Sequence, residues 1–294
     1  MSKMLSVSPS ELPVSELHAY LLGAVGPRPI AFASTIDEEG RPNLSPFSFF
    51  NVFSANPPVM IFSPARRVRD NTTKHTLENV MKIREVVINV VDFDMVQQMS
   101  LASTEYEEGE NEFVKAGLTM IASEEVRPFR VGESPVQFEC RVMKVEPMGQ
   151  EGGAGNLVFA EVVKIHLAKR ILNPDGGIDQ HKIDQVARMG GNWYTRANMG
   201  MFEVPKPIRS KGMGVDKLPS HIRNSEILSG NDLGMLGNVE ALPIVEEIDE
   251  FVNENPEIRS LKENNNRELI HKKAKEYLMK NEVSSAWKVL MLIQ

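Results

Sequence analysis

The sequence predicts a mainly β fold, a closed or nearly closed antiparallel barrel with peripheral helices and a helical C-terminal appendage. Before about residue 205, short segments rich in Val, Ile and Phe alternate with Gly and Pro, which is typical of strands and turns. Helical patterns are few in this part. From about residue 242 onward, apolar residues recur at spacings of three and four, which indicates helices. Many strands with few helices favour a barrel over a doubly wound parallel sheet.

Six segments of the first part have strand character: residues 29–36, 44–50, 59–62, 86–91, 136–145 and 157–167. The acidic turn DEEG joins the first two segments. In the fifth, Val136, Phe138 and Cys140 alternate with polar residues, which predicts that only one face of this strand is buried. Glycines at positions 152, 153 and 155 separate the last two segments, as in a long hairpin connection.

Two helices are expected in this part, over residues 76–82 and 94–101, because Thr76 and Asp94 are good N-cap residues. We expect residues 1–207 to form one domain and residues 208–294 to form a connecting arm followed by a small helical appendage. The stretch before about residue 242 is polar and turn-rich without clear periodicity. Beyond it, two apolar helix faces are predicted, formed by Ile270, Ala274, Tyr277 and Leu278, and by Trp287, Leu290 and Met291.

Composition excludes several classes of protein. The formal net charge is −7, which argues against nucleic acid as a partner. The single cysteine, Cys140, excludes a disulfide framework and a cysteine-rich metal site within one chain. No apolar run approaches the roughly 18 residues that span a bilayer, and the first residues lack a signal-peptide core. We therefore expect a cytoplasmic protein that has no membrane partner.

Several catalytic motifs are absent from the sequence. It contains no GxGxxG after a strand, no GxxxxGK[ST], no GxSxG and no HExxH, which disfavours a Rossmann domain, a P-loop nucleotidase, an α/β-hydrolase and a zincin. The six histidines show no metal-ligand spacing. We expect no metal site.

Two strand segments carry polar groups suited to a ligand. GPRPIAFAST ends in two adjacent hydroxyls. In NLSPFSFF, small polar residues alternate with aromatic rings, so hydroxyl and backbone groups can bind the edge of a heteroaromatic ring while aromatic side chains cover its face. A core strand with a proline bulge is the alternative interpretation.

The third segment, SPARRVRDNTTKHTLENV, concentrates positive charge in an acidic protein. Its cations are Arg66, Arg67, Arg69 and Lys74. Threonines then lead into a predicted helix, whose N-terminal amide groups suit a phosphate. A solvated basic loop is the alternative. Together, the aromatic strip and the basic helix start predict a pocket for flavin mononucleotide (FMN).

RPIAFAST, NLSPFSFF, NPPVMIF, KHTLENV and EVVINV follow one another in this order. This set resembles the flavin reductase-like, FMN-binding split-barrel family, which includes flavoredoxins and NAD(P)H:flavin oxidoreductases. The resemblance covers roughly residues 15–205. It implies a six-stranded Greek-key split barrel that forms a homodimer, with FMN at or near the subunit interface.

The resemblance also implies cofactor-binding residues. Ser34 and Thr35 match the pair beside the flavin phosphate or ribityl chain. Positions that match the isoalloxazine-contacting strip, largely through main-chain groups, are Asn43, Ser45, Phe47, Ser48 and Phe49. The family pattern Lys-Asp-Thr-x-x-Asn places Lys74, Thr76 and Asn79 at the phosphate. Here His75 replaces the Asp, and Arg66, Arg67 and Arg69 are expected to share the phosphate.

A later stretch, VARMGGNWY, is similar to the family's Arg-x-Gly-Gly…Tyr segment. The resemblance implies that Arg188 and Tyr194 lie near the exposed face of the flavin. Arg188 is the candidate cation for the negative charge of the reduced ring, with a surface or interface salt bridge as the alternative.

The expected function is an FMN-binding oxidoreductase that passes electrons from NADH or NADPH through bound flavin to free flavin, iron or a partner protein. A flavoredoxin-like electron carrier without its own NAD(P)H turnover is the alternative. A third possibility is a dimerising scaffold with an empty pocket, which the presence of Asn43, Ser48, Lys74 and Thr76 disfavours.

Overall fold

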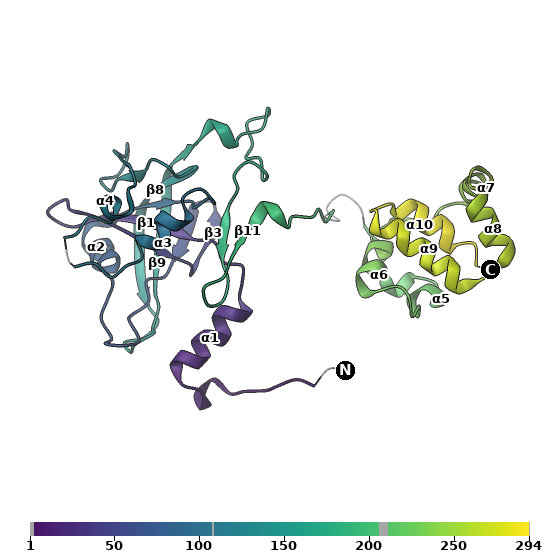
Figure 1. Cartoon of the computed structure of the whole chain (residues 1–294), viewed down its shortest axis with the longest axis horizontal. Coiled ribbons are helices and arrows are strands. Elements are labelled where there is room, and N and C mark those ends of the chain that lie inside the picture. The colour runs from purple at the N-terminus through teal and green to yellow at the C-terminus, as the bar shows by residue number, and fades with distance from the viewer. Residues whose placement is uncertain (1–2, 108, 206–210, 294) are drawn as a thin grey trace. The chain divides into compact units, whose positions relative to one another are not determined.

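The computed structural model describes residues 3–107, 109–205 and 211–293. The chain divides into two compact units, Met1–Phe202 and Glu203–Gln294 (Figure 1). The domain boundary expected at residue 207 lies outside the described residues.

The first unit is built on a seven-stranded antiparallel sheet with the strand order β2-β1-β5-β8-β9-β4-β3. In chain order its strands are β1 Ala31–Ile36, β2 Pro42–Phe47, β3 Phe50–Ala55, β4 Pro58–Phe62, β5 Glu85–Asn89, β8 Val136–Pro147 and β9 Asn156–Leu167. The edge strands β2 and β3 are separated by only two residues, Ser48 and Phe49. The sheet therefore has to curl until its two edges meet, which makes it a barrel. The predicted mainly β barrel is confirmed, with seven strands in the sheet where the resemblance implied six.

Two small ribbons lie outside the sheet, and three of the described helices pack against it. The ribbons pair β6 Met120–Ile121 with β7 Arg130–Val131, and β10 Val186–Arg188 with β11 Tyr194–Arg196. The helices are α2 His75–Ile83, α3 Val96–Leu101 and α4 Glu112–Ala116. One core cluster lies between the barrel strands and α2, and another lies beneath α3 and α4. Strand β1 is buried on both faces because it separates these clusters.

The structure corrects three predictions for this unit. The single strand expected over residues 44–50 is two strands, because the chain bends at Ser48 and Phe49 to pass from β1 to β4. Thr76 and Asp94 are not N-caps. Helix α2 follows Lys74 and α3 follows Met95, each without a side-chain cap. Helix α1, Val14–Ala24, was not predicted, and it buries no residue.

The prediction that β8 buries one face only is also wrong. Gln137 and Glu139 lie on its polar face, yet both are buried, and Glu139 is completely so. The carboxylate of Glu139 accepts hydrogen bonds from the backbone N–H groups of residues 124, 125 and 126. The segment before β7 covers this face of β8 because its own backbone donors need that acceptor.

The second unit is helical, with α5 Ser220–Arg223, α6 Gly230–Gly237, α7 Val245–Glu254, α8 Pro256–Asn264, α9 Arg267–Met279 and α10 Val283–Leu290. Trp287 is buried at its centre. The predicted burial of Ile270, Ala274 and Leu278 is confirmed. Helices α5 and α6 correct the expectation of an arm without regular structure before residue 242. A capping box of Ser229 and Asp232 starts α6. Among the described residues, no helix is long and apolar enough to cross a membrane.

Candidate functional site

A hydrogen-bonded network joins the start of α2 to β1 and β2. The Thr76 hydroxyl donates to Asn43 Oδ1 at 2.7 Å, and the Thr35 hydroxyl donates to the same oxygen at 3.4 Å. Asn79 Nδ2 donates to Thr35 Oγ1 at 3.1 Å. Four of the predicted site residues therefore lie together. Since Thr35, Thr76 and Asn79 are buried, their side chains hold α2 in place and are not open to a ligand.

Glu112 anchors this network, although nothing in the sequence singled it out. Its carboxylate accepts from Asn43 Nδ2 at 2.8 Å and from the Leu44 N–H at 3.0 Å. Burial raises the pKa of Glu112, and these hydrogen bonds only partly oppose that rise. Because an ionised carboxylate can only accept, Asn43 must turn its amide nitrogen toward Glu112. The amide oxygen of Asn43 then faces Thr76 and Thr35.

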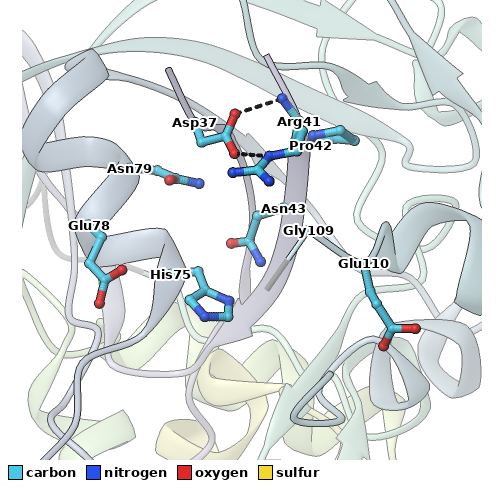
Figure 2. Close-up of a pocket in the computed structure, with 9 residues that line it drawn as sticks. All are labelled: Asp37, Arg41, Pro42, Asn43, His75, Glu78, Asn79, Gly109 and Glu110. Atoms are coloured by element: carbon cyan, nitrogen blue, oxygen red, sulfur yellow. Dashed lines mark hydrogen bonds and ion pairs between the residues drawn. The ribbon is translucent and has the colours of Figure 1, made fainter. Parts of the chain in front are cut away.

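A small hollow lies beside the network (Figure 2). It is lined by Asp37, Arg41, Pro42, Asn43, His75, Glu78, Asn79, Gly109 and Glu110. On its wall, Arg41 donates to Asp37 through its backbone N–H at 2.8 Å and its Nε at 2.5 Å. The hollow has a volume of about 40 Å³, which holds a few waters at most. This hollow is too small for a nucleotide.

The basic segment before α2 contains two kinds of cation. Its arginines form hydrogen bonds or ion pairs, whereas its lysine forms no ion pair among the described residues. Arg66 donates to the side chain and carbonyl of Asn71, so it shapes the loop. Arg67 and Arg69 both form ion pairs with Glu105. Among the described residues, Lys74 forms no ion pair. Burial, and then the positive charge of Arg67, lower the pKa of Lys74, and the negative charge of Glu105 partly opposes them. A half-buried cation that forms no ion pair within the described residues thus lies at the uncapped start of the nine-residue helix α2.

A larger hollow lies between α3 and the β10–β11 ribbon. Its volume is about 180 Å³, and it is lined by Ile30, Pro46, Ser48, Met99, Ser100, Ser103, Arg188 and Tyr194. The Arg188 guanidinium lies over the Tyr194 ring, 4.6 Å from its centroid. The structure therefore brings Ser48, Arg188 and Tyr194 together, although they come from distant parts of the sequence.

Arg28 supports this hollow from behind, and sequence reasoning missed it. It is 6% exposed. Its guanidinium donates to the carbonyls of Leu22 and Met189 at 2.6 and 2.8 Å, and to that of Val25. Arg28 thereby ties the end of α1 to the turn between β10 and β11. In the sequence, Arg28 lies in the segment RPIAFAST, but the prediction for this segment rested on the two hydroxyl residues at its end.

The remaining predicted residues line neither hollow. Ser34 and Thr35 are adjacent in β1, so their side chains point to opposite faces, and one ligand cannot contact both hydroxyls. Phe47 packs on Phe62 in the barrel core, with ring centroids 5.5 Å apart. Phe49 is 39% exposed at the corner between β2 and β3. Ser45 is half-buried opposite Ala33. Within the described ranges, no three His, Cys, Asp or Glu residues are grouped to hold a metal.

The curled antiparallel sheet, the uncapped N-terminus of α2 and the hollow lined by Tyr194 together match the architecture of a split-barrel protein. The chain belongs to the flavin reductase-like family, since the flavin reductase like domain matches residues 24–181. At the level of the family, this makes it a flavin-binding oxidoreductase.

The chain is also similar to individual proteins. Protein BH2278 of Halalkalibacterium halodurans is 38% identical over 209 residues, which are 70% of this chain and 99% of that protein. Nitrilotriacetate monooxygenase component B from Bacillus cereus has a similar structure, with a TM-score of 0.65 and 29% identity over 69% of this chain and 100% of that chain. A protein of Shewanella frigidimarina with a split barrel domain has a TM-score of 0.58 at 25% identity, over 69% of this chain and 100% of its own.

Proposed function

We propose that this protein binds FMN and passes electrons from NADH or NADPH through it to a second acceptor. The observation that carries the proposal is Lys74, a half-buried cation that forms no ion pair within the described residues and lies at the uncapped start of α2. Helix N-terminal amides together with a cation suit a phosphate monoester. This donor set fits the phosphate of FMN. Arg67 and Arg69, whose charge Glu105 already balances, are secondary contributors.

Strand β2 connects this phosphate place with the larger hollow. It runs from Asn43, beside the α2 start, toward Ser48 on the wall of the hollow. Five residues of extended chain span about 17 Å, so an elongated nucleotide lying along β2 reaches both places. Because β2 is an edge strand of the sheet, some of its main-chain groups have no neighbouring strand to pair with. The Leu44 N–H already donates to Glu112, so the carbonyl groups and the main chain at Ser48 are the parts of this edge proposed to bind a ring. Main-chain binding agrees with the positions expected from residues 43–49.

The residues of the larger hollow have separate roles in this proposal. Bound FMN supplies the two-electron redox chemistry. Ser48 offers a hydroxyl to the ring edge, and Tyr194 supplies an aromatic wall. Arg188 places positive charge where the reduced ring carries negative charge, which stabilises the reduced state. No acid–base pair is required of the chain.

The proposed assembly is a homodimer in the cytoplasm with the flavin near the subunit interface. Large apolar side chains support it, since Phe53, Trp193 and Phe202 are 64%, 77% and 84% exposed. Burial of these side chains in a subunit interface would remove their apolar surface from water. The single cysteine, Cys140, is buried and unpaired, which suits a reducing compartment.

Turnover and binding are tested separately. Protein loaded with FMN is mixed with NADH or NADPH without oxygen, and loss of the flavin absorbance shows electron transfer. Continued NAD(P)H oxidation with excess free FMN distinguishes an enzyme from a carrier, which is reduced once and then stops. Failure of both nicotinamides to reduce bound flavin contradicts the donor assignment.

Lys74→Gln tests the phosphate place. Losing one charge-assisted contact, worth about 1.5–3 kcal/mol, raises the Kd for FMN about 10- to 150-fold. Lys82→Gln is the matched control, because Lys82 lies on the same helix but is 58% exposed and pairs with Glu38. Equal FMN affinity in the two variants contradicts the assignment.

A further inference from the structure

Two arginines share one face of the β10–β11 ribbon. In its register, Arg188 lies opposite Tyr194 and Val186 lies opposite Arg196. Side chains two residues apart on a strand point to the same side, as do directly opposite residues. All four therefore face the same way, with the two arginines on neighbouring same-face rungs about 7 Å apart.

A second hollow lies along this face, and the proposed flavin site does not use it. Its volume is about 230 Å³, and it is lined by Phe93, Val96, Gln97, Ser100, Val186, Tyr194, Thr195 and Arg196. Ser100 and Tyr194 also line the larger hollow of the proposed flavin site, which is called the first hollow below. The two hollows are therefore neighbours between α3 and the ribbon, and one ligand can extend from one into the other.

The wall of the second hollow contains a fixed cation–aromatic pair. The Arg196 guanidinium lies over the Phe93 ring, 4.0 Å from its centroid. Asp184 holds the guanidinium by accepting from Nε at 2.7 Å and from Nη2 at 2.6 Å. Phe93 is nevertheless 46% exposed, and the Arg196 side chain is 37% exposed. A planar guanidinium and an aromatic ring that are held in place but left open form a stacking surface for another planar ring.

We propose that the second hollow binds the adenosine half of the nicotinamide dinucleotide, with the adenine ring stacked on the Phe93–Arg196 pair. This inference rests on the proposed function, because it assigns the other half of the donor to the first hollow. The diphosphate that links the two halves is negatively charged, and Arg188, on the same face of the ribbon, is the cation that would meet it. The charge of Arg196 is already balanced by Asp184, so Arg196 contributes its stacking face. A neutral apolar ligand leaves this charge unused.

Binding of ADP-ribose to the full-length, flavin-free protein tests the inference without any redox reaction. Calorimetry is carried out on the wild type, Phe93→Leu and Phe159→Leu. Leucine keeps the apolar bulk but removes the aromatic face, and stacking on a base is worth about 1–3 kcal/mol. We expect Phe93→Leu to weaken ADP-ribose binding about 5- to 150-fold. Phe159 is the control because its ring also lies under a cation, Lys144 at 4.4 Å, but on β9. Absence of binding to the wild type, or equal binding to all three proteins, overturns the inference.

Steady-state kinetics with FMN gives a second readout. Reduced nicotinamide mononucleotide, which lacks the adenosine half, is compared with NADH. Phe93→Leu is expected to raise the KM for NADH about tenfold, as loss of one stacking contact predicts, and to leave kcat and both constants for the mononucleotide unchanged. A variant that shifts both donors equally, or neither, contradicts the adenosine site. If the wild type oxidises neither donor, the proposed function fails, and the ADP-ribose experiment still decides the inference.

Discussion

Glu139→Gln is the substitution whose energetic effect follows most directly from the structure. The Glu139 side chain is completely buried. Its carboxylate accepts from the backbone N–H groups of Glu124, Glu125 and Val126 at 2.6–3.2 Å, and lies 2.7 Å from His166 Nε2. An amide keeps one acceptor oxygen but loses the charge that strengthens these bonds. At about 1 kcal/mol for each of three backbone bonds, the variant loses about 3 kcal/mol of unfolding free energy.

The pH dependence of this loss has a definite sign. Burial alone raises the pKa of Glu139, but the backbone N–H groups of residues 124 and 125 and the His166 side chain outweigh it, so the pKa lies below its ordinary value of 4.5. The stabilisation is therefore complete above pH 4.5 and is lost as the pH falls through the lower, folded-state pKa. The variant has no such carboxylate. The stability difference between wild type and variant narrows below pH 4.5.

Hydrogen exchange of peptides from β5 and β8 measures this difference, because these strands report on the first unit alone. Glu146→Gln is the control, since Glu146 lies on the same strand and is 53% exposed. We expect it to change the opening free energy by less than about 0.5 kcal/mol. If Glu139→Gln also changes it by so little at pH 7, the buried carboxylate does not hold the covering segment and the reasoning is refuted.

Two other changes have defined outcomes. Arg28→Lys cannot reach the three carbonyls that the guanidinium contacts, so hydrogen exchange in α1 and in the turn before β11 should rise at least tenfold, as the loss of one charge-assisted bond implies; unchanged exchange there rules out its supporting role. In the second unit, burial, then Arg267 and His221, lower the pKa of His271 to about 4. The unfolded chain therefore binds the proton more readily than the folded unit. Stability should fall as the pH drops from 6.5 toward 4, by about 3 kcal/mol, when followed by Trp287 fluorescence in a Trp193→Phe background. A stability that does not change over this range contradicts the burial of a neutral imidazole.

The strands that could be predicted are those whose own residues and bounding turns form a recognisable local pattern. The segments 59–62 and 157–167 coincide closely with β4 and β9, because β-branched and aromatic residues there end at Gly, Pro or polar turns. The break between β2 and β3 could not be predicted. It arises where the curled sheet exchanges one neighbouring strand for another, and that exchange is a property of the whole barrel.

The candidate site was partly predictable for the same reason. Lys74, Thr76 and Asn79 lie within one helix start, so a local motif contains them. Glu112 and Arg28 contact atoms of residues 68 and 161 positions away, respectively. The residues that flank a single Glu or Arg in the sequence do not indicate such a distant contact. A family resemblance also assigns a role to a residue without showing which way its side chain points. Ser34 and Thr35 illustrate this, because their side chains point to opposite faces of β1.

The central claim is that FMN is the resident cofactor, and an absorbance spectrum tests it most directly. The purified protein is mixed with FMN, desalted and measured between about 300 and 550 nm, where flavins absorb. We expect bands near about 370 and 450 nm that stay with the protein, and weaker bands for Lys74→Gln than for Lys82→Gln. A protein that is colourless after desalting, with FMN recovered entirely in the free fraction, contradicts it.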